Sequence, residues 1–129
     1  MEYQRRFGIE IEFKGNRAEV AHQINRLGVA CTEESYNHHT RAHWKIVTDA
    51  SLGYENAGEV VSPILQGRQG IRQLEIVCEA LELAGATVDR HCGLHVHLDA
   101  RDMSVAEIQT VFKRYSDYEQ QIDRIMPPS

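Results

Sequence analysis

The chain has 129 residues, 42% of them hydrophobic and 26% charged, which is an ordinary composition for one compact domain with a single core. Its formal charge of −5 argues against a broad basic surface for nucleic acid, and no apolar stretch is long enough for a membrane span or a signal peptide. Three cysteines without CxxC spacing favour reduced thiols, so we expect a cytoplasmic protein with neither nucleic-acid nor membrane partners.

The first predicted element is a half-buried strand over residues 6–13, because apolar and polar residues alternate there. Its apolar face would hold Phe7, Ile9, Ile11 and Phe13. Glu10 and Glu12 fall side by side on the opposite face, where like charges repel unless a cation or a proton bridges them. The pair therefore points to a hard divalent cation such as Mg²⁺, and the alternative is a solvated strand face.

A short amphipathic helix is predicted next. Asn16 and Glu19 have the spacing of a capping box, and apolar residues recur at helical spacing until Gly28. The polar run that follows, over residues 29–40, predicts only a strand end and an exposed loop.

Two neighbouring strands are predicted over residues 43–48 and 58–62, both rich in β-branched residues. Glu59 on the second strand is either a solvated carboxylate or a metal ligand. Lys45 on the first strand could balance Glu59 in a salt bridge, which is the alternative to a metal ligand at Glu59.

The connection over residues 49–57 begins with Asp49 and Ser51, where a strand enters a glycine-containing loop. Side chains and backbone amides at such a position often contact a phosphate or a metal, which makes these two residues candidates for the site. An Asx turn explains the same residues without a ligand.

A second helix is predicted over residues 67–84, with Gly85 at its C-terminal end, and we expect Thr87 to begin a strand. Alternation returns over residues 93–99, where His95 and His97 share one face. This spacing suits joint metal ligation or contact with an anionic substrate, although exposed strand histidines show it too.

A third helix follows a capping box formed by Ser104 and Glu107. The order of elements, with short links between strands, favours an α+β fold in which helices cover one face of a mostly antiparallel sheet. The other face would hold the charges. We therefore expect four side chains from three strands to converge on one concave face, namely Glu10, Glu12, Glu59 and His95.

Four motifs in this order resemble the amidoligase family of carboxylate–amine ligases: Phe7-Gly8-Ile9-Glu10-Ile11-Glu12, Asp49-Ala50-Ser51-Leu52, Glu59-Val60-Val61-Ser62-Pro63 and Gly93-Leu94-His95-Val96-His97. The resemblance implies a single domain over residues 1–129, the N-terminal part of a catalytic domain. It also implies a fold similar to glutamine synthetase and glutamate–cysteine ligase, whose antiparallel sheet forms a funnel for ATP and Mg²⁺ or Mn²⁺.

The resemblance further implies metal ligands at Glu10, Glu12, Glu59 and His95. His97 would face substrate or phosphate and act with Asp49 and Ser51 as a catalytic residue, and we expect Lys45, Ser51 and His97 to contact the nucleotide.

The implied reaction converts a small-molecule or peptide carboxylate into an acyl phosphate, which an amine displaces to give an amide or isopeptide bond. A non-catalytic metal-binding module and a metal-dependent hydrolase are the alternatives.

Overall fold

The computed structural model describes residues 4–48 and 55–126. The chain divides into two compact units, Met1–Leu98 and Asp99–Ser129. The single domain expected over residues 1–129 stays a prediction. Among the described residues, none of the helices combines the length and the apolar content that crossing a membrane requires.

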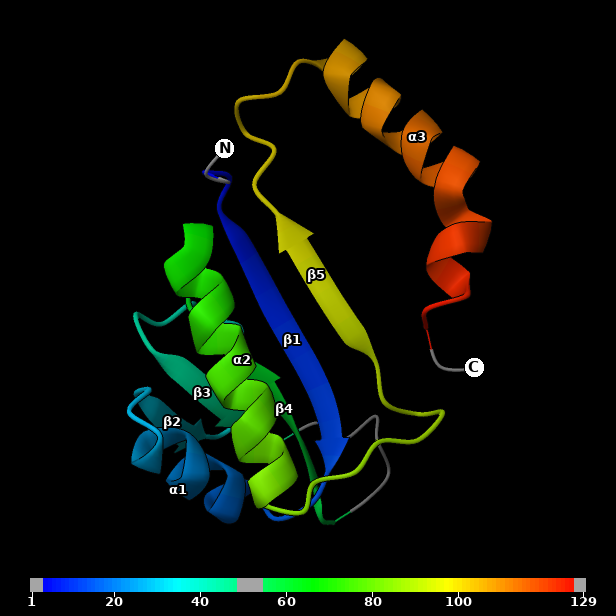
Figure 1. Ribbon diagram of the computed structural model, residues 1–129. Coiled ribbons are helices and arrows are strands. Elements are labelled where there is room, and N and C mark those ends of the chain that lie inside the picture. Colours follow the sequence, from blue (N-terminus) through cyan, green and yellow to red (C-terminus); the bar gives the residue numbers. More distant parts are fainter. Residues whose placement is uncertain (1–3, 49–54, 127–129) are drawn as a thin grey trace. The chain divides into compact units, whose positions relative to one another are not determined.

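The first unit is built on a five-stranded sheet with the order β2-β3-β4-β1-β5 (Figure 1). The strands are β1 (Phe7–Lys14), β2 (Cys31–Glu34), β3 (Trp44–Val47), β4 (Ala57–Val61) and β5 (Leu94–Leu98). The pair β2–β3 is parallel, and the other three pairs are antiparallel. The mostly antiparallel α+β fold is therefore confirmed, whereas the glutamine synthetase-like funnel stays a prediction.

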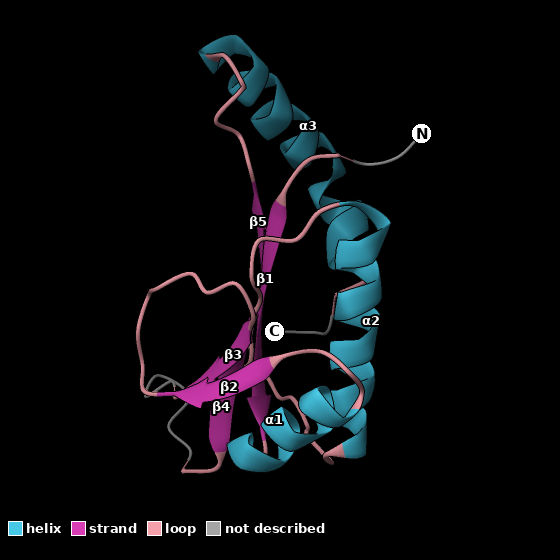
Figure 2. Cartoon of the chain, turned by 90° about the vertical axis from the view of Figure 1, so that its left-hand side faces the viewer, coloured by secondary structure: helices cyan, strands magenta, loops and turns pink. Residues whose placement is uncertain are grey.

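Two helices of this unit, α1 (Arg17–Arg26) and α2 (Gly67–Leu83), pack on the same face of the sheet (Figure 2). Asn16 caps α1 by accepting a hydrogen bond from the backbone N–H of Glu19 at 3.0 Å. Between helices and sheet lies the core, whose fully buried side chains include Phe13, Val20, Ile24, Trp44, Ile46, Val60 and Val77.

The prediction that a strand begins at Thr87 is wrong. Thr87 exchanges two backbone hydrogen bonds with Lys14 but forms only an isolated bridge. Pairing stops there because the chain turns immediately afterwards, with the backbone N–H of Cys92 donating to the carbonyl of Asp89 at 3.0 Å. Thr87 thus forms a single antiparallel β-bridge with Lys14, the last residue of β1.

The second unit contains helix α3 (Val105–Asp123). Both halves of the predicted capping box are present, because the Ser104 hydroxyl accepts from the N–H of Glu107 and the Glu107 carboxylate accepts from the N–H of Ser104. The predicted start of this helix is confirmed.

Candidate metal centre

The register of β1 with its two neighbours gathers polar side chains on the sheet face opposite the helices. Glu10 lies across from His95 on β5, and Glu12 lies across from Glu59 on β4. Laterally paired residues of a sheet project to the same face. Three strands therefore deliver these four side chains to one surface.

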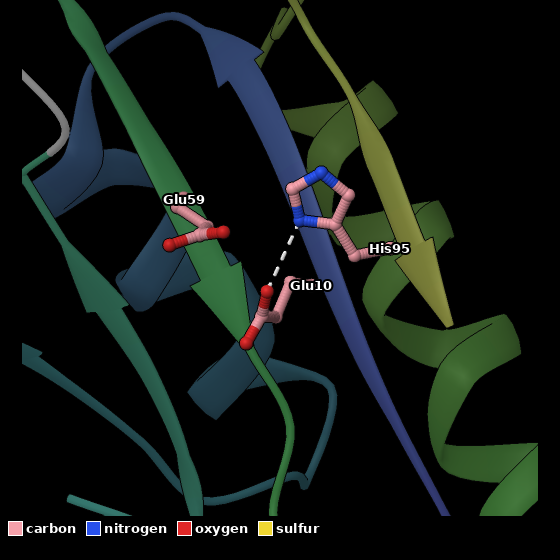
Figure 3. Close-up of side chains that lie close together, drawn as sticks. All are labelled: Glu10, Glu59 and His95. Carbon is pink, nitrogen blue, oxygen red and sulfur yellow. Dashed lines mark hydrogen bonds and ion pairs between the residues drawn. The ribbon is translucent and has the colours of Figure 1, made fainter. Parts of the chain in front are cut away.

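Three of them form a compact triad. Glu10, Glu59 and His95 each offer one ligand atom, and the three atoms lie within 4.8 Å of one another. Figure 3 shows these side chains, from β1, β4 and β5, pointing toward one another. Ligand atoms that share one ion lie no farther apart than about twice a bond length of roughly 2.0–2.6 Å. Separations of up to 4.8 Å meet this limit for the longer bonds, and the side chains would draw slightly closer around an ion as small as Mg²⁺.

The donor set also suits such an ion. Carboxylate oxygens favour Mg²⁺ and Mn²⁺, and an imidazole nitrogen is accepted by the softer Mn²⁺. Three protein ligands leave coordination positions open for water or substrate oxygens, as catalytic metal sites require. The arrangement can therefore hold a cation and still expose it to a ligand.

Two histidines hold Glu10 in its charged form. His95 Nδ1 lies 3.1 Å from Glu10 Oε2, and His97 Nε2 lies 3.3 Å from Glu10 Oε1. Burial raises the pKa of the Glu10 carboxyl, but the hydrogen bonds from His95 and His97 outweigh it and hold that pKa below its usual value. Glu10 is thus ionised near neutral pH, which is the state that a metal ligand needs.

Glu12 lies beside the triad and is fixed by the backbone. Its Oε2 accepts a hydrogen bond from the N–H of Gly93 at 2.5 Å. A Cβ added at Gly93 would lie 3.2 Å from this oxygen and 3.2 Å from His95 Nε2. The backbone of β1 approaches Gly93 as well, because the N–H of Glu12 donates to the Gly93 carbonyl at 3.0 Å.

The triad and Glu12 line a cavity of about 290 Å³. Its other described walls are Val61 and Lys45 on the strands and residues 36–40, namely Tyr36, Asn37, His38, His39 and Thr40. Sequence reasoning missed this segment and treated it as an exposed loop. Its signal is the density of hydrogen-bonding side chains, including the adjacent His38 and His39, but that signal carries no periodicity.

Lys45 lies on the polar face, with only 2% of its surface exposed. Its Nζ donates to the carbonyl and to Oδ1 of Asn37, at 3.0 and 2.8 Å, and to the carbonyl of His39 at 2.8 Å. These three acceptors match the three N–H donors of an ammonium. A cofactor contact by Lys45 stays a prediction.

The remaining predicted site residues are His97, Asp49 and Ser51. His97 borders the centre, with a side chain that is 63% exposed, through its contact with Glu10. Asp49 and Ser51 lie outside the described residues, so their predicted roles stay predictions.

Comparison with known proteins gives one match. The model of the family described as "Putative amidoligase enzyme" matches residues 3–129. No curated protein and no solved structure matches the chain.

Proposed function

Because the chain belongs to the amidoligase family, which is named for ligase enzymes, we propose that it joins a carboxylate to an amine in a reaction that depends on ATP and on Mg²⁺ or Mn²⁺. The observation that carries this proposal is the triad of Glu10, Glu59 and His95 on three neighbouring strands. In a ligase of this type the protein mainly positions its substrates and neutralises charge.

The proposed chemistry has two steps. An oxygen of the substrate carboxylate attacks the γ-phosphorus of ATP, ADP leaves, and an acyl phosphate forms. The nitrogen of the amine then attacks the acyl carbon, phosphate leaves, and the amine loses a proton as the amide or isopeptide bond forms. A bound divalent cation supplies positive charge beside the phosphate oxygens.

In this proposal Glu10, Glu59 and His95 hold the cation. Glu12 adds negative charge beside them, in an orientation set by Gly93. His97 faces the phosphate or the substrate, and Asp49 and Ser51 act at the same site.

The size of the cavity supports a binding mode in which only part of the nucleotide lies inside it. Pockets for whole small molecules measure roughly 300–1,000 Å³, and this cavity of about 290 Å³ lies just below that range. We therefore place the cation and the terminal phosphates of ATP inside it, and the adenosine outside it. The substrates would be small-molecule or peptide carboxylates and amines, in the cytoplasm.

Calorimetry with ATP tests the proposal. We expect binding with Mn²⁺ or Mg²⁺ and none in EDTA, because clustered carboxylates repel bare phosphates. Glu59→Gln keeps the side-chain shape but removes a ligand charge, so it should weaken metal-dependent ATP binding at least about tenfold. Glu119→Gln, on α3, is the matched control and should bind as the wild type does.

The alternatives give different results in the same experiment. Equal ATP binding in EDTA would count against the ligase. Metal uptake that leaves nucleotide binding unchanged would favour the non-catalytic metal-binding module.

A further inference from the structure

Residues 35–43 connect β2 to β3, and part of this loop forms a wall of the cavity above the triad. Figure 2 shows the connection on the side of the sheet opposite α1 and α2. We call residues 36–40 the wall segment. The proposed metal ligands lie on strands, so among the described residues that line the cavity the wall segment is the part that does not belong to the sheet.

The wall segment differs in charge from the floor of the cavity. The floor contains three glutamates, Glu10, Glu12 and Glu59. The wall segment has the sequence YNHHT, which contains no carboxylate. Its hydroxyl and imidazole side chains can donate hydrogen bonds, whereas the Asn37 amide already donates to Glu34 and to the Ser35 carbonyl. Phosphate oxygens are acceptors, so they fit against the wall segment better than against the floor.

Lys45 and Asn37 connect the wall segment to the sheet. An ammonium buried as deeply as that of Lys45 is stable only if acceptors satisfy it, and here all three come from Asn37 and His39. Asn37 also donates to Glu34 Oε2 at 3.0 Å, and its Oδ1 accepts from the N–H of His39 at 3.1 Å. The lysine and the loop therefore hold each other in place.

A second attachment lies at the far end of the loop. Arg41 donates to both carboxylate oxygens of Glu34, with Nε 3.1 Å from Oε1 and Nη2 2.9 Å from Oε2. The hydrogen bond from Arg41 lowers the pKa of Glu34 to about 2, so this pair stays charged at neutral pH. The wall segment is thus fixed through Asn37 and His39 within it, and through Arg41, the residue that follows it.

We propose that Lys45 is a positioning residue, which holds the wall segment against the phosphate end of a nucleotide bound at the triad. This inference rests on the proposed function for the nucleotide and on the hydrogen bonds for the loop. It gives Lys45 a role different from the direct cofactor contact that the sequence predicts.

Two variants separate the two roles. Lys45→Met removes the ammonium but keeps an unbranched side chain of similar length. Asn37→Ala keeps the ammonium and removes the side-chain acceptor that attaches the loop. If Lys45 acts through the wall segment, both variants have the same effects; if Lys45 touches phosphate directly, only Lys45→Met weakens nucleotide binding.

The experiment combines amide hydrogen exchange with calorimetry on the whole chain, using Mn²⁺ alone and then Mn²⁺ with ATP. In both variants we expect exchange over residues 36–40 to rise at least about tenfold, and exchange in α2 to stay unchanged. Affinity for Mn²⁺ alone should stay within about twofold, because its ligands lie on strands, and affinity for ATP with Mn²⁺ should fall about tenfold. Lys113→Met, at an exposed pair on α3, is the control and should change none of these values.

Unchanged exchange over residues 36–40 in both variants would overturn the proposal, and so would weaker nucleotide binding in Lys45→Met alone. If Lys45→Met raises exchange throughout the sheet, Asn37→Ala decides, because it leaves Lys45 with two backbone acceptors. A wild-type chain that binds no ATP with Mn²⁺ would refute the proposed function and the nucleotide contact, while the exchange data would still decide whether Lys45 holds the loop.

Discussion

Gly93 offers a sharp test of the metal centre, because a single methyl group there touches two of its side chains. In Gly93→Ala the new Cβ would lie 3.2 Å from both Glu12 Oε2 and His95 Nε2, closer than most Cβ contacts. Each neighbour must then move by a few tenths of an ångström, whereas metal–ligand distances tolerate only about ±0.2 Å. The methyl group therefore disturbs one proposed ligand, His95, and its neighbour Glu12 directly.

The expected loss can be estimated. Changes beside metal ligands lower metal affinity about 10–100-fold, and we take the lower value because one side chain can rotate slightly. A tenfold loss of Mn²⁺ affinity corresponds to about 1.4 kcal/mol. The fold should change little, because Gly93 is half-buried and is not among the positive-φ glycines of the described residues. We expect its unfolding free energy to change by less than about 1 kcal/mol.

Calorimetric Mn²⁺ titration and urea unfolding, on the same samples, measure the two quantities. Gly8→Ala is the matched control, since it adds a methyl on the same face of β1 at an ordinary 3.7 Å from His97 Cβ. Its Mn²⁺ affinity should stay within about twofold of the wild type. Unchanged affinity in Gly93→Ala, at unchanged stability, would refute the assignment of His95 as a ligand. An equal loss in both variants would show that any methyl on this face disturbs the centre.

Three further predictions concern stability and pH. Gly70→Ala places a Cβ 2.9 Å from Leu65 Cβ, so overpacking should outweigh the gain in helix propensity and lower the unfolding free energy by about 1–3 kcal/mol, measured by urea unfolding. Ser62→Ala removes the hydroxyl that accepts from a buried backbone N–H at 2.8 Å, which should lower the same quantity by about 1–2 kcal/mol, whereas Ser62→Thr should keep most of it. Hydrogen bonding from Arg41 holds the pKa of Glu34 at about 2 instead of its usual 4.5. The contribution of this ion pair to holding the loop in place is therefore complete above pH 4.5 and is lost as the pH falls toward 2. Exchange protection of residues 36–40, corrected for intrinsic rates, should therefore be constant from pH 7 to 5 and decline below 4.5, and a decline already at pH 6 would contradict this assignment.

The alternation of residues along the chain predicted which face of each strand is polar. In β1 it placed Glu10 and Glu12 opposite Phe7, Ile9 and Phe13, and the structure buries those three apolar side chains. Such a pattern does not determine the register between strands. Glu10 lies across from His95 because β1 pairs with β5, two strands that are far apart in the sequence. Alternation within each strand cannot predict that pairing.

The wall segment could not be predicted in the same way. Its polar composition is typical of an exposed loop, and nothing in it repeats at the period of a strand or a helix. The hydrogen bonds from Lys45 to the carbonyls of Asn37 and His39 depend on backbone conformation, which side-chain patterns do not encode. The parallel pairing of β2 was missed for a related reason, because a strand of four residues gives too little alternation to recognise.

The central position of β1 has a consequence for how the chain folds. Glu10 is made early in synthesis, but its partner His95 follows 85 residues later, after the five elements α1, β2, β3, β4 and α2 have been made. A nascent chain that ends before Gly93 holds the carboxylates of Glu10 and Glu59 without the imidazole and without the amide that orients Glu12. Contacts of such long sequence separation form slowly, because the ordering of the intervening chain must precede them. If the triad binds Mn²⁺ as we propose, tight binding would begin only when β5 joins the sheet, and metal uptake during refolding would report that step directly.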